Sequence, residues 1–425
     1  MTIALLDIND SNLQLWHGST HLQSPGYALL EGKQYRFGIP ARAAARLQPR
    51  DINTRFWWQL STEALQPALG PARHTGDLVH AQLQALHREG GQPQEVLMAV
   101  SGSMQRDQLA LLLGIVQQCP FAAVGLVNRS VALGSINGAN GRLFHLEVQL
   151  HQSVISELTQ SNGEVRLQRT QPLPGAGLLQ VQERLVEIIA TAFIRQTRFD
   201  PRRQALTEQH LYDALPNALR ALGRESETNI EVNGYRARIN RLDLQDAGTR
   251  LLESAREAMG SLQPEDRVIA DPVAGLLPGL AERLPGLQLL AADSVRNALE
   301  QQLEGLVQRD QALSFVTTLP SLAASTPAPK SQPEVTVASP APVAVAKPAA
   351  THLLRGFQAV PLTAAGTSLG PGWDIQHTAA GWQLRGSGAA VLVNDAPLQP
   401  DQVLGGGDSL SVGDGPLLRL IEVAS

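Results

Sequence analysis

The chain has 425 residues, and its 34 basic and 39 acidic side chains give a formal net charge of −5. This length predicts two or more domains, and the balanced, slightly acidic charge excludes the basic surface on which nucleic-acid binding depends. A single cysteine, Cys119, excludes an internal disulfide and a cysteine-based metal cluster.

The first element is an apolar strand, Thr2 to Leu6, which runs into a polar turn over 7–12 and returns as a second strand from Leu13 to Trp16. Asp7 and Asp10 interrupt this apolar run, so it does not have the pattern of a secretory signal. No other stretch approaches the ~20 apolar residues of a membrane span. The sequence therefore predicts a cytoplasmic protein without membrane insertion.

The segment from Glu95 to Ser153 predicts strands that alternate with a helix. Val96 to Val100 is the short apolar run typical of a buried strand, and apolar residues in Gln105 to Gln118 recur at the three- and four-residue spacing of a helix. A second apolar strand is expected over Ala122 to Val127. From Leu143 to Ser153 apolar and polar residues alternate, which predicts a strand with one buried face and one polar face.

The following segment predicts four helices, a hairpin and two short strands. The hairpin turns at Asn233-Gly234, a strong two-residue turn signal. The helices are expected over 178–196, 208–222, 243–259 and 294–307, and the strands over 267–270 and 287–291.

Composition changes abruptly near Ser321. From there to Ala350 the chain is rich in Pro, Ala, Ser, Thr, Val and Lys and has no apolar periodicity, which predicts a disordered linker. Short apolar runs separated by glycine turns then predict a small β-sandwich. The expected organisation is a domain over 1–320, a linker over 321–350 and a second domain over 351–425.

In the order of its patterns, the first domain resembles the nucleotide-binding domain of the DnaK-type (seventy-kilodalton heat-shock) chaperones. Phe37-Gly38 before the alanine-rich segment 41–45, Gln105-Arg106 at a helix, and the segment 128–132 after a strand look like the corresponding segments of that family. The resemblance implies an α/β, actin-like two-lobed ATPase fold with ribonuclease H-like halves.

The resemblance also indicates where a nucleotide cleft would lie. In that family, two glycine-containing hairpins let backbone N–H groups approach the ATP phosphates, an acidic residue in each holds water around the metal, and a Gly-Gly turn supports the adenosine. The residues that the resemblance assigns to this cleft are Asp7, Asn9, Asp10, Ser11, Glu147 and Asp271.

This chain departs from the family at each of these turns. In the first hairpin, the glycine position is Asn9, and the additional carboxylate of Asp10 follows it. The second hairpin, over 145–150, contains no glycine, and the adenosine turn is Asp271-Pro272. Side chains at these positions occupy the space that bare backbone leaves for phosphate.

Two further departures remove charge. The catalytic lysine of the family aligns near Gln59, and a glutamate aligns near Arg129. Because phosphoryl transfer depends on such groups, we expect no efficient ATPase, no catalytic residue and no bound cofactor. Binding of ATP and magnesium through Asp7, Ser11 and Glu147 by an altered route is the alternative.

The second domain resembles the forkhead-associated (FHA) β-sandwich over its last part, through Val391 to Leu398, Gly407-Asp408 and Gly413. The phosphothreonine site of that family requires an arginine after an early strand. The early segment 369–375 has no such arginine, and Arg385 is the candidate substitute and partner-binding residue.

Other polar patterns favour less specific roles. His145, Glu147 and His151 are expected to share one strand face and to form a polar cleft wall, because the two histidines are too far apart along a strand for one metal ion. The sequence presents no recognisable Ser-His-Asp set.

Together these patterns predict a heat-shock-chaperone-like, actin-fold protein that acts as a scaffold or adaptor for protein partners. The alternative is a nucleotide-binding DnaK-type chaperone ATPase. A peptide- or phosphopeptide-binding adaptor that acts through the last domain is compatible with the first hypothesis.

Overall fold

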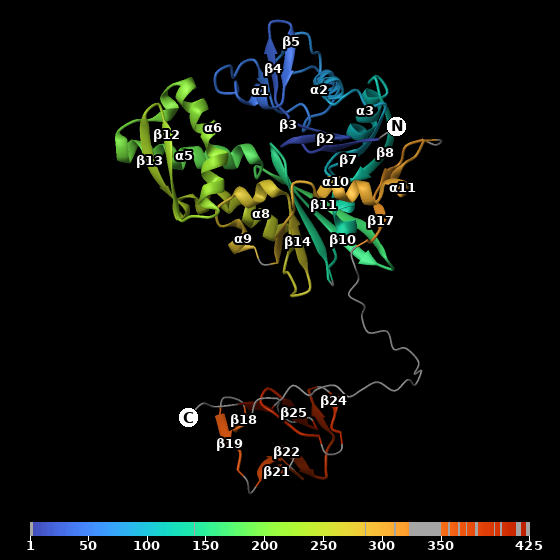
Figure 1. Cartoon of the computed structure of the whole chain (residues 1–425), viewed down its shortest axis with the longest axis vertical. Helices are drawn as coiled ribbons and strands as arrows, with labels where there is room; N and C mark the ends of the chain where they lie inside the picture. The colour runs from blue at the N-terminus through green and yellow to red at the C-terminus, as the bar shows by residue number, and fades with distance from the viewer. Residues whose placement is uncertain are drawn as a thin grey trace. The chain divides into compact units, whose positions relative to one another are not determined.

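The computed structural model describes residues 3–139, 141–284, 286–309, 312–322, 350–355, 358–363, 366–370, 372–378, 381–394, 396–399, 402–413 and 418–421. The chain divides into two compact units, Met1–Pro329 and Lys330–Ser425 (Figure 1). The first unit is mixed α/β and the second is a β-sandwich. Most of the predicted linker over 321–350 lies outside the described residues.

The first unit contains two six-stranded sheets that share one order over five strands. In the first sheet, β1, β2 and β3 form an antiparallel meander, and β1 also pairs in parallel with β7, which pairs in parallel with β8. In the second sheet, β9, β10 and β11 form the meander, and β9 pairs in parallel with β14, which pairs in parallel with β15. The topology of the first sheet is therefore repeated in the second.

The strands of the first sheet are β1 (Ala4–Ile8), β2 (Leu13–His17), β3 (Thr20–Ser24), β7 (Glu95–Val100), β8 (Ala122–Asn128) and β16 (Phe315–Val316). The strands of the second sheet are β9 (Leu143–Val148), β10 (Gln152–Ser161), β11 (Glu164–Pro174), β14 (Arg267–Ala270), β15 (Leu287–Leu289) and β17 (Thr318–Pro320).

Helices cover both outer faces of the two sheets and fill the layer between them. Side chains of α2 and α3 pack on one face of the first sheet, and those of α5 and α8 pack on one face of the second. Helices α4 and α10 contribute to a core that includes residues of both sheets. These helices are α2 (Thr75–Glu89), α3 (Arg106–Val116), α4 (Arg129–Ile136), α5 (Leu178–Thr197), α8 (Thr249–Met259) and α10 (Ser294–Gln301).

This layering corrects the prediction for Leu143 to Ser153. The segment is not one strand with a polar face: β9 ends at Val148, a turn follows, and β10 begins at Gln152. All six residues of β9 are buried, because helices or the other sheet cover both of its faces. Sequence alternation alone does not reveal that the polar face is also covered.

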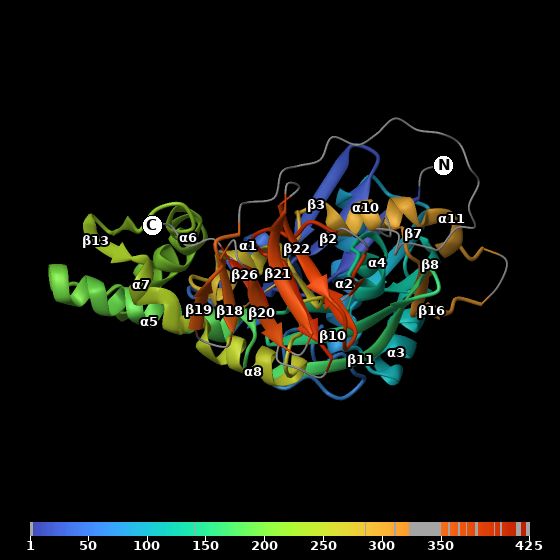
Figure 2. The ribbon, with the colours of Figure 1, turned by 90° about the horizontal axis from the view of Figure 1, so that it is seen from below.

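Each sheet carries one insertion between its meander and its parallel strands. The first insertion contains β4 (Ala28–Glu31), β5 (Gln34–Phe37), α1 (Ile39–Arg42) and β6 (Ile52–Asn53). The second contains α5 and α8 together with α6 (Ala205–Leu222), β12 (Glu227–Val232), β13 (Tyr235–Asn240) and α7 (Arg241–Leu244). Figures 1 and 2 show α5, α6 and β13 grouped to one side of the unit.

Two predicted helices are interrupted. The helix expected over 294–307 is divided into α10 and α11 (Leu303–Leu306) at Gln302, whose side chain donates to the carbonyl of Pro320 at 2.7 Å. The helix expected over 243–259 is divided by a 3-10 turn before α8. After Asp271 the chain forms a 3-10 turn and the short helix α9 (Leu280–Arg283). No helix among the described residues is long and apolar enough to cross a bilayer.

The second unit consists of a six-stranded antiparallel sheet and a three-stranded sheet that share one apolar core. Leu353 and Leu410 from the larger sheet and Ile375 from the smaller one are completely buried in it. The strands are β18 (His352–Arg355), β19 (Gln358–Pro361), β20 (Thr367–Gly370), β21 (Trp373–Thr378), β22 (Gly381–Gly386), β23 (Val391–Val393), β24 (Ala396–Pro397), β25 (Ser409–Val412) and β26 (Leu418–Ile421).

The start of α5 is anchored on the turn between β9 and β10. The N–H groups of Leu178 and Leu179 donate to the carbonyls of Gln149 and Leu150, at 2.8 and 3.0 Å. These N–H groups have no partner within the helix. Gly177 allows this approach, because a Cβ there would lie 2.4 Å from the carbonyl carbon of His151.

We therefore expect Gly177→Ala to destabilise the protein by about 1–3 kcal/mol, since either the helix or the turn must shift. Gly248→Ala is the matched control, because no atom lies within 4 Å of its added Cβ and its φ of −92° suits alanine. Urea unfolding of the full chain measures both variants. Equal unfolding midpoints for the two variants would contradict the packing described for Gly177.

Candidate functional site

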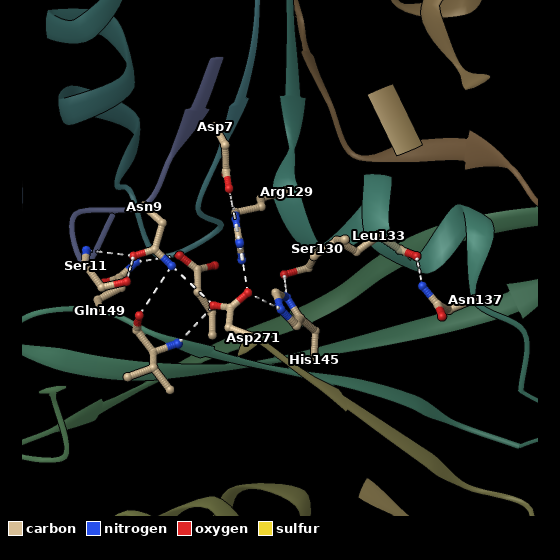
Figure 3. A network of polar contacts seen from close by, with 12 residues as sticks. Asp7, Asn9, Ser11, Arg129, Ser130, Leu133, Asn137, His145, Gln149 and Asp271 are labelled. Atoms are coloured by element: carbon tan, nitrogen blue, oxygen red, sulfur yellow. Dashed lines mark hydrogen bonds and ion pairs between the residues drawn. The ribbon is translucent and has the colours of Figure 1, made fainter. Parts of the chain in front are cut away.

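The carboxyl ends of β1, β8, β9 and β14 meet around the side chain of Arg129 (Figure 3). Arg129 is the first residue of α4, and Asn128 caps this helix by accepting a hydrogen bond from the N–H of Val131 at 3.1 Å. The cap fixes the direction of the first helical turn. The side chain of Arg129 is only 5% exposed and lies in the layer between the two sheets.

The guanidinium of Arg129 forms ion pairs with one carboxylate from each of the two sheets. Its Nε and Nη2 donate to the two carboxylate oxygens of Asp7 at 2.7 and 3.2 Å, and Nη2 also lies 2.8 Å from Oδ1 of Asp271. Asp7 belongs to the first sheet, and Asp271 directly follows a strand of the second. Both carboxylates are buried, so these are charge-assisted contacts in a region of low dielectric constant.

Asn9 occupies the space between the turn after β1 and the second sheet. Its Nδ2 donates to Oδ2 of Asp271 at 3.2 Å and to the carbonyl of Val148 at 3.3 Å. Its Oδ1 accepts from both the N–H and the hydroxyl of Ser11, each at 2.9 Å. The N–H of Val148 donates to the same oxygen of Asp271 at 3.3 Å. Asn9 therefore holds its own turn closed and ties it to the opposite strand.

Asp10 makes the second direct contact between the two hairpins. Its Oδ1 accepts from the N–H of Leu150 at 2.8 Å. Burial raises the pKa of Asp10 to about 7; the Leu150 hydrogen bond opposes this effect and the charge of Glu147 adds to it. The N–H of Leu150 is thus already used within the protein.

Asp7, Asn9, Asp10, Arg129 and Asp271 form the Arg129 cluster. Glu147 lies beside this cluster and is completely buried. Its Oε1 accepts from Nε2 of Gln149 at 2.9 Å, and its Oε2 has no hydrogen-bond partner among the described residues. Burial raises the pKa of Glu147, although Arg129 opposes this effect. Burial disfavours the charged form of a carboxyl, which is the cause of this shift.

The pKa values of Asp7 and Asp271 are shifted in opposite directions. Burial raises the pKa of Asp7 despite its contacts with Arg129. Burial also acts to raise the pKa of Asp271, but Arg129 and His145 outweigh it and hold that pKa well below its usual range. The pKa of Asp271 is therefore shifted in the opposite direction to those of Asp7, Asp10 and Glu147.

Ser130, His145 and Asp271, which the sequence did not connect, lie in a line in space (Figure 3). The hydroxyl of Ser130 lies 2.8 Å from Nδ1 of His145, and Nε2 of His145 lies 3.6 Å from Oδ1 of Asp271. Both Ser130 and His145 are 0% exposed. A substrate cannot reach the serine hydroxyl, so this line does not have the access that nucleophilic catalysis requires.

The predicted polar cleft wall is only partly correct. His145 and Glu147 do share one face of β9, but that face is buried between the sheets. His151 lies in the turn beyond the strand, where its ring stacks on Trp58 at 5.2 Å and its Nε2 lies 3.0 Å from the carbonyl of Thr54. Burial lowers the pKa of His151 to about 4. The described residues include no group of three or more histidine, cysteine or acidic side chains able to hold a metal ion.

A cavity of about 130 Å³ adjoins the cluster, bounded by Asp7, Asn9, Arg129 and the segments 271–273 and 290–295. It is well below the ~300–1,000 Å³ typical of sites for drug-sized ligands.

The six residues assigned to the cleft from sequence all lie at this junction. Arg385, the remaining candidate, lies on β22 of the second unit, where its Nη2 donates to Oε1 of Gln383 at 2.7 Å. Sequence reasoning missed the central position of Arg129. The available signal was a single charge between the apolar strand 122–127 and the apolar run 131–133, since a charge in a buried segment needs partners.

Comparison of the chain with protein-family models and with curated proteins finds no match. The assignment of a function therefore depends on the geometry of the cluster.

Replacing Arg129 by Met leaves two buried carboxylates without their cation, so we expect a loss of about 3–5 kcal/mol in the free energy of unfolding. Arg296→Met is the matched control, because Arg296 forms an exposed pair with Glu300 on one helix and such pairs contribute about 0.3–0.5 kcal/mol. Urea unfolding measures both. Similar small losses would show that Arg129 does not hold the cluster together.

Asp10 generates a pH dependence of stability. Its pKa is higher in the folded than in the unfolded protein, so the folded state binds more protons between pH ~4 and ~7, and stability decreases as pH rises through this range. Asn at this position can still accept from Leu150 but does not titrate. The difference in unfolding free energy, Asp10→Asn minus the natural protein, should therefore rise by about 2 kcal/mol from pH 5 to pH 8. A difference in unfolding free energy that does not change with pH would refute the raised pKa of Asp10.

Proposed function

We propose that the first unit is a DnaK-type, actin-like fold whose nucleotide site has been replaced by an internal ion-pair cluster, and that the protein acts as a nucleotide-independent scaffold or adaptor for protein partners. Support for the fold comes from the two sheets with one strand order, the helical layer that they share, and the insertion at the same place in each. Support for the function comes from the residues at the junction of the two sheets.

The position of Arg129 is the observation that carries the proposal. The resemblance assigns Asp7 to metal-bound water and Asp271 to the turn that supports the adenosine, and the guanidinium of Arg129 already lies between these two carboxylates. An arginine remains charged at every physiological pH. The carboxylates therefore have a permanent cation within the chain, and a magnesium ion would have to compete with it.

The backbone donors of the two hairpins support the same conclusion. A phosphate cradle requires N–H groups that point at the ligand. Here the N–H of Leu150 donates to Asp10, and the N–H of Val148 donates to Asp271. Binding of phosphate would break these buried hydrogen bonds and would place a polyanion beside Asp10 and Glu147. The residues present do not fit magnesium and a triphosphate, so no catalytic step through them is proposed.

The second unit supports an adaptor role. It is a β-sandwich with its own apolar core, resembling the forkhead-associated domain over its last strands. Two units with separate cores give the chain two independent surfaces. Joined in one chain, they increase the effective concentration of one partner site near the other.

Isothermal titration calorimetry of the full chain with magnesium and ATP tests the proposal. We expect no saturable heat up to millimolar nucleotide and a phosphate-release rate equal to that of buffer, because the cluster leaves neither the donors nor the space for the phosphates. Proteins captured by the full chain from a lysate should be the same whether ATP is added or enzymatically removed.

The variant Asp7→Asn tests whether any nucleotide binding occurs at the predicted cleft. Micromolar binding of magnesium and ATP that is lost in Asp7→Asn would overturn the scaffold hypothesis in favour of the nucleotide-binding chaperone. A captured set of proteins that changes with ATP would have the same consequence.

A further inference from the structure

The strands β12 and β13 form a separate two-stranded sheet to one side of the first unit (Figure 1). They pair antiparallel from Glu227↔Asn240 to Val232↔Tyr235 without a bulge. Apolar side chains of both strands pack with those of α5 and α6 in one core. Each outer edge of such a sheet carries backbone groups that the partner strand does not satisfy. The availability of these edges decides whether a further strand can pair with the sheet.

The two-residue turn at Asn233-Gly234 fixes which backbone groups face outward. Its φ angles of 52° and 78° are those of a type I′ hairpin turn. In such a hairpin the residues that flank the turn exchange two hydrogen bonds, and along the strands bonded and non-bonded pairs then alternate. The N–H and C=O groups of residues 229 and 231 on β12, and of 236 and 238 on β13, therefore point away from the partner strand.

The outer edge of β13 is closed by a side chain of α5. Oε1 of Gln196 accepts from the N–H of Arg238 at 2.9 Å, and Nε2 of Gln196 donates to the carbonyl of Arg238 at 2.8 Å. These two bonds confirm that the backbone groups of residue 238 face outward. They also occupy the groups that a further strand would need at this position.

The outer edge of β12 is open. Asn229 and Glu231 are exposed, and no described residue bonds to their outward N–H and C=O groups. Glu227 is paired with Arg238 at 2.8 Å, whereas Glu231 forms no ion pair within the described part of the chain. An open edge is a template for another strand. The charge of Glu231 restricts which strand can pair there.

A second copy of β12 is complementary to this edge in one antiparallel register. A two-fold axis at Ile230 places Asn229 of each chain opposite Glu231 of the other, and each facing pair exchanges two backbone hydrogen bonds. The amide can also donate to the facing carboxylate. An axis at residue 229 places Glu227 opposite Glu231, and an axis at residue 231 places Glu231 opposite itself. Facing like charges are unfavourable, so the edge selects the register at Ile230.

We infer that the protein forms a two-fold symmetric dimer in which the β12 strands of two copies pair, so that two hairpins become one four-stranded sheet. Arg236 is opposite Glu231 within each hairpin, so each Glu231 carboxylate lies between an arginine of its own chain and an amide of the other. A sheet of four strands is more stable than a two-stranded hairpin. The inference does not depend on the proposed loss of nucleotide binding, and it gives the scaffold two copies of each surface.

Sedimentation equilibrium of the full chain at micromolar concentrations tests the inference, and we expect a reversible dimer. Asn229→Asp places two pairs of carboxylates opposite each other in the dimer and should weaken dimerisation by about tenfold or more. Asn229→Lys places a cation opposite Glu231 and should strengthen it. Gln117→Asp and Gln117→Lys make the same changes in net charge at an exposed position on another element, and they should leave the dissociation constant unchanged.

Asn229→Pro tests the backbone contacts. Proline removes the outward N–H and should abolish the dimer, whereas Asn229→Thr keeps this N–H and should dimerise as the natural protein does. Because the N–H has no partner among the described residues of one chain, the two variants should unfold at similar temperatures as monomers.

Three results would overturn the inference. The first is a monomer at every concentration tested. The second is a dimer that Asn229→Pro leaves intact. The third is a dimer that responds equally to Asn229→Asp and Asn229→Lys, since this would exclude the register in which residue 229 faces Glu231.

Discussion

A buried guanidinium between two carboxylates fixes the relation of the two large sheets. Arg129 takes one partner, Asp7, from the first sheet and another, Asp271, from the end of a strand in the second. Ionic groups in such surroundings are stable only when each has its counter-charge. The positions of β1, α4 and β14 therefore depend on one another, and the hairpin turns close around the same centre.

Two side chains of the turn after β1 fill the space in front of the opposite turn. Asn9 donates to the carbonyl of Val148, and Asp10 accepts from the N–H of Leu150. Both side chains are buried. Together they close the junction of the two turns with internal hydrogen bonds.

Local patterns predicted most strands and helices, because period-two and three-to-four-residue spacings reflect burial along one element. The resemblance assigned six residues to one cleft, and these six lie at one junction, whereas the central position of Arg129 was not predicted. Contacts across the fold were not predictable. The covered polar face of β9 results from the layer between two sheets, and Arg129 and Asp7 are 122 positions apart in sequence. The interruption at Gln302 likewise results from a contact with β17, which the local sequence does not encode.

Helix α5 has a mechanical consequence for this junction. It has 20 residues and is therefore about 30 Å long, and its first amides are bonded to the turn that faces Asp10. The position of its far end, near Thr197, therefore depends on the same turn that Asp10 contacts, so the outer surface of the second insertion and the buried ion pairs share one anchor.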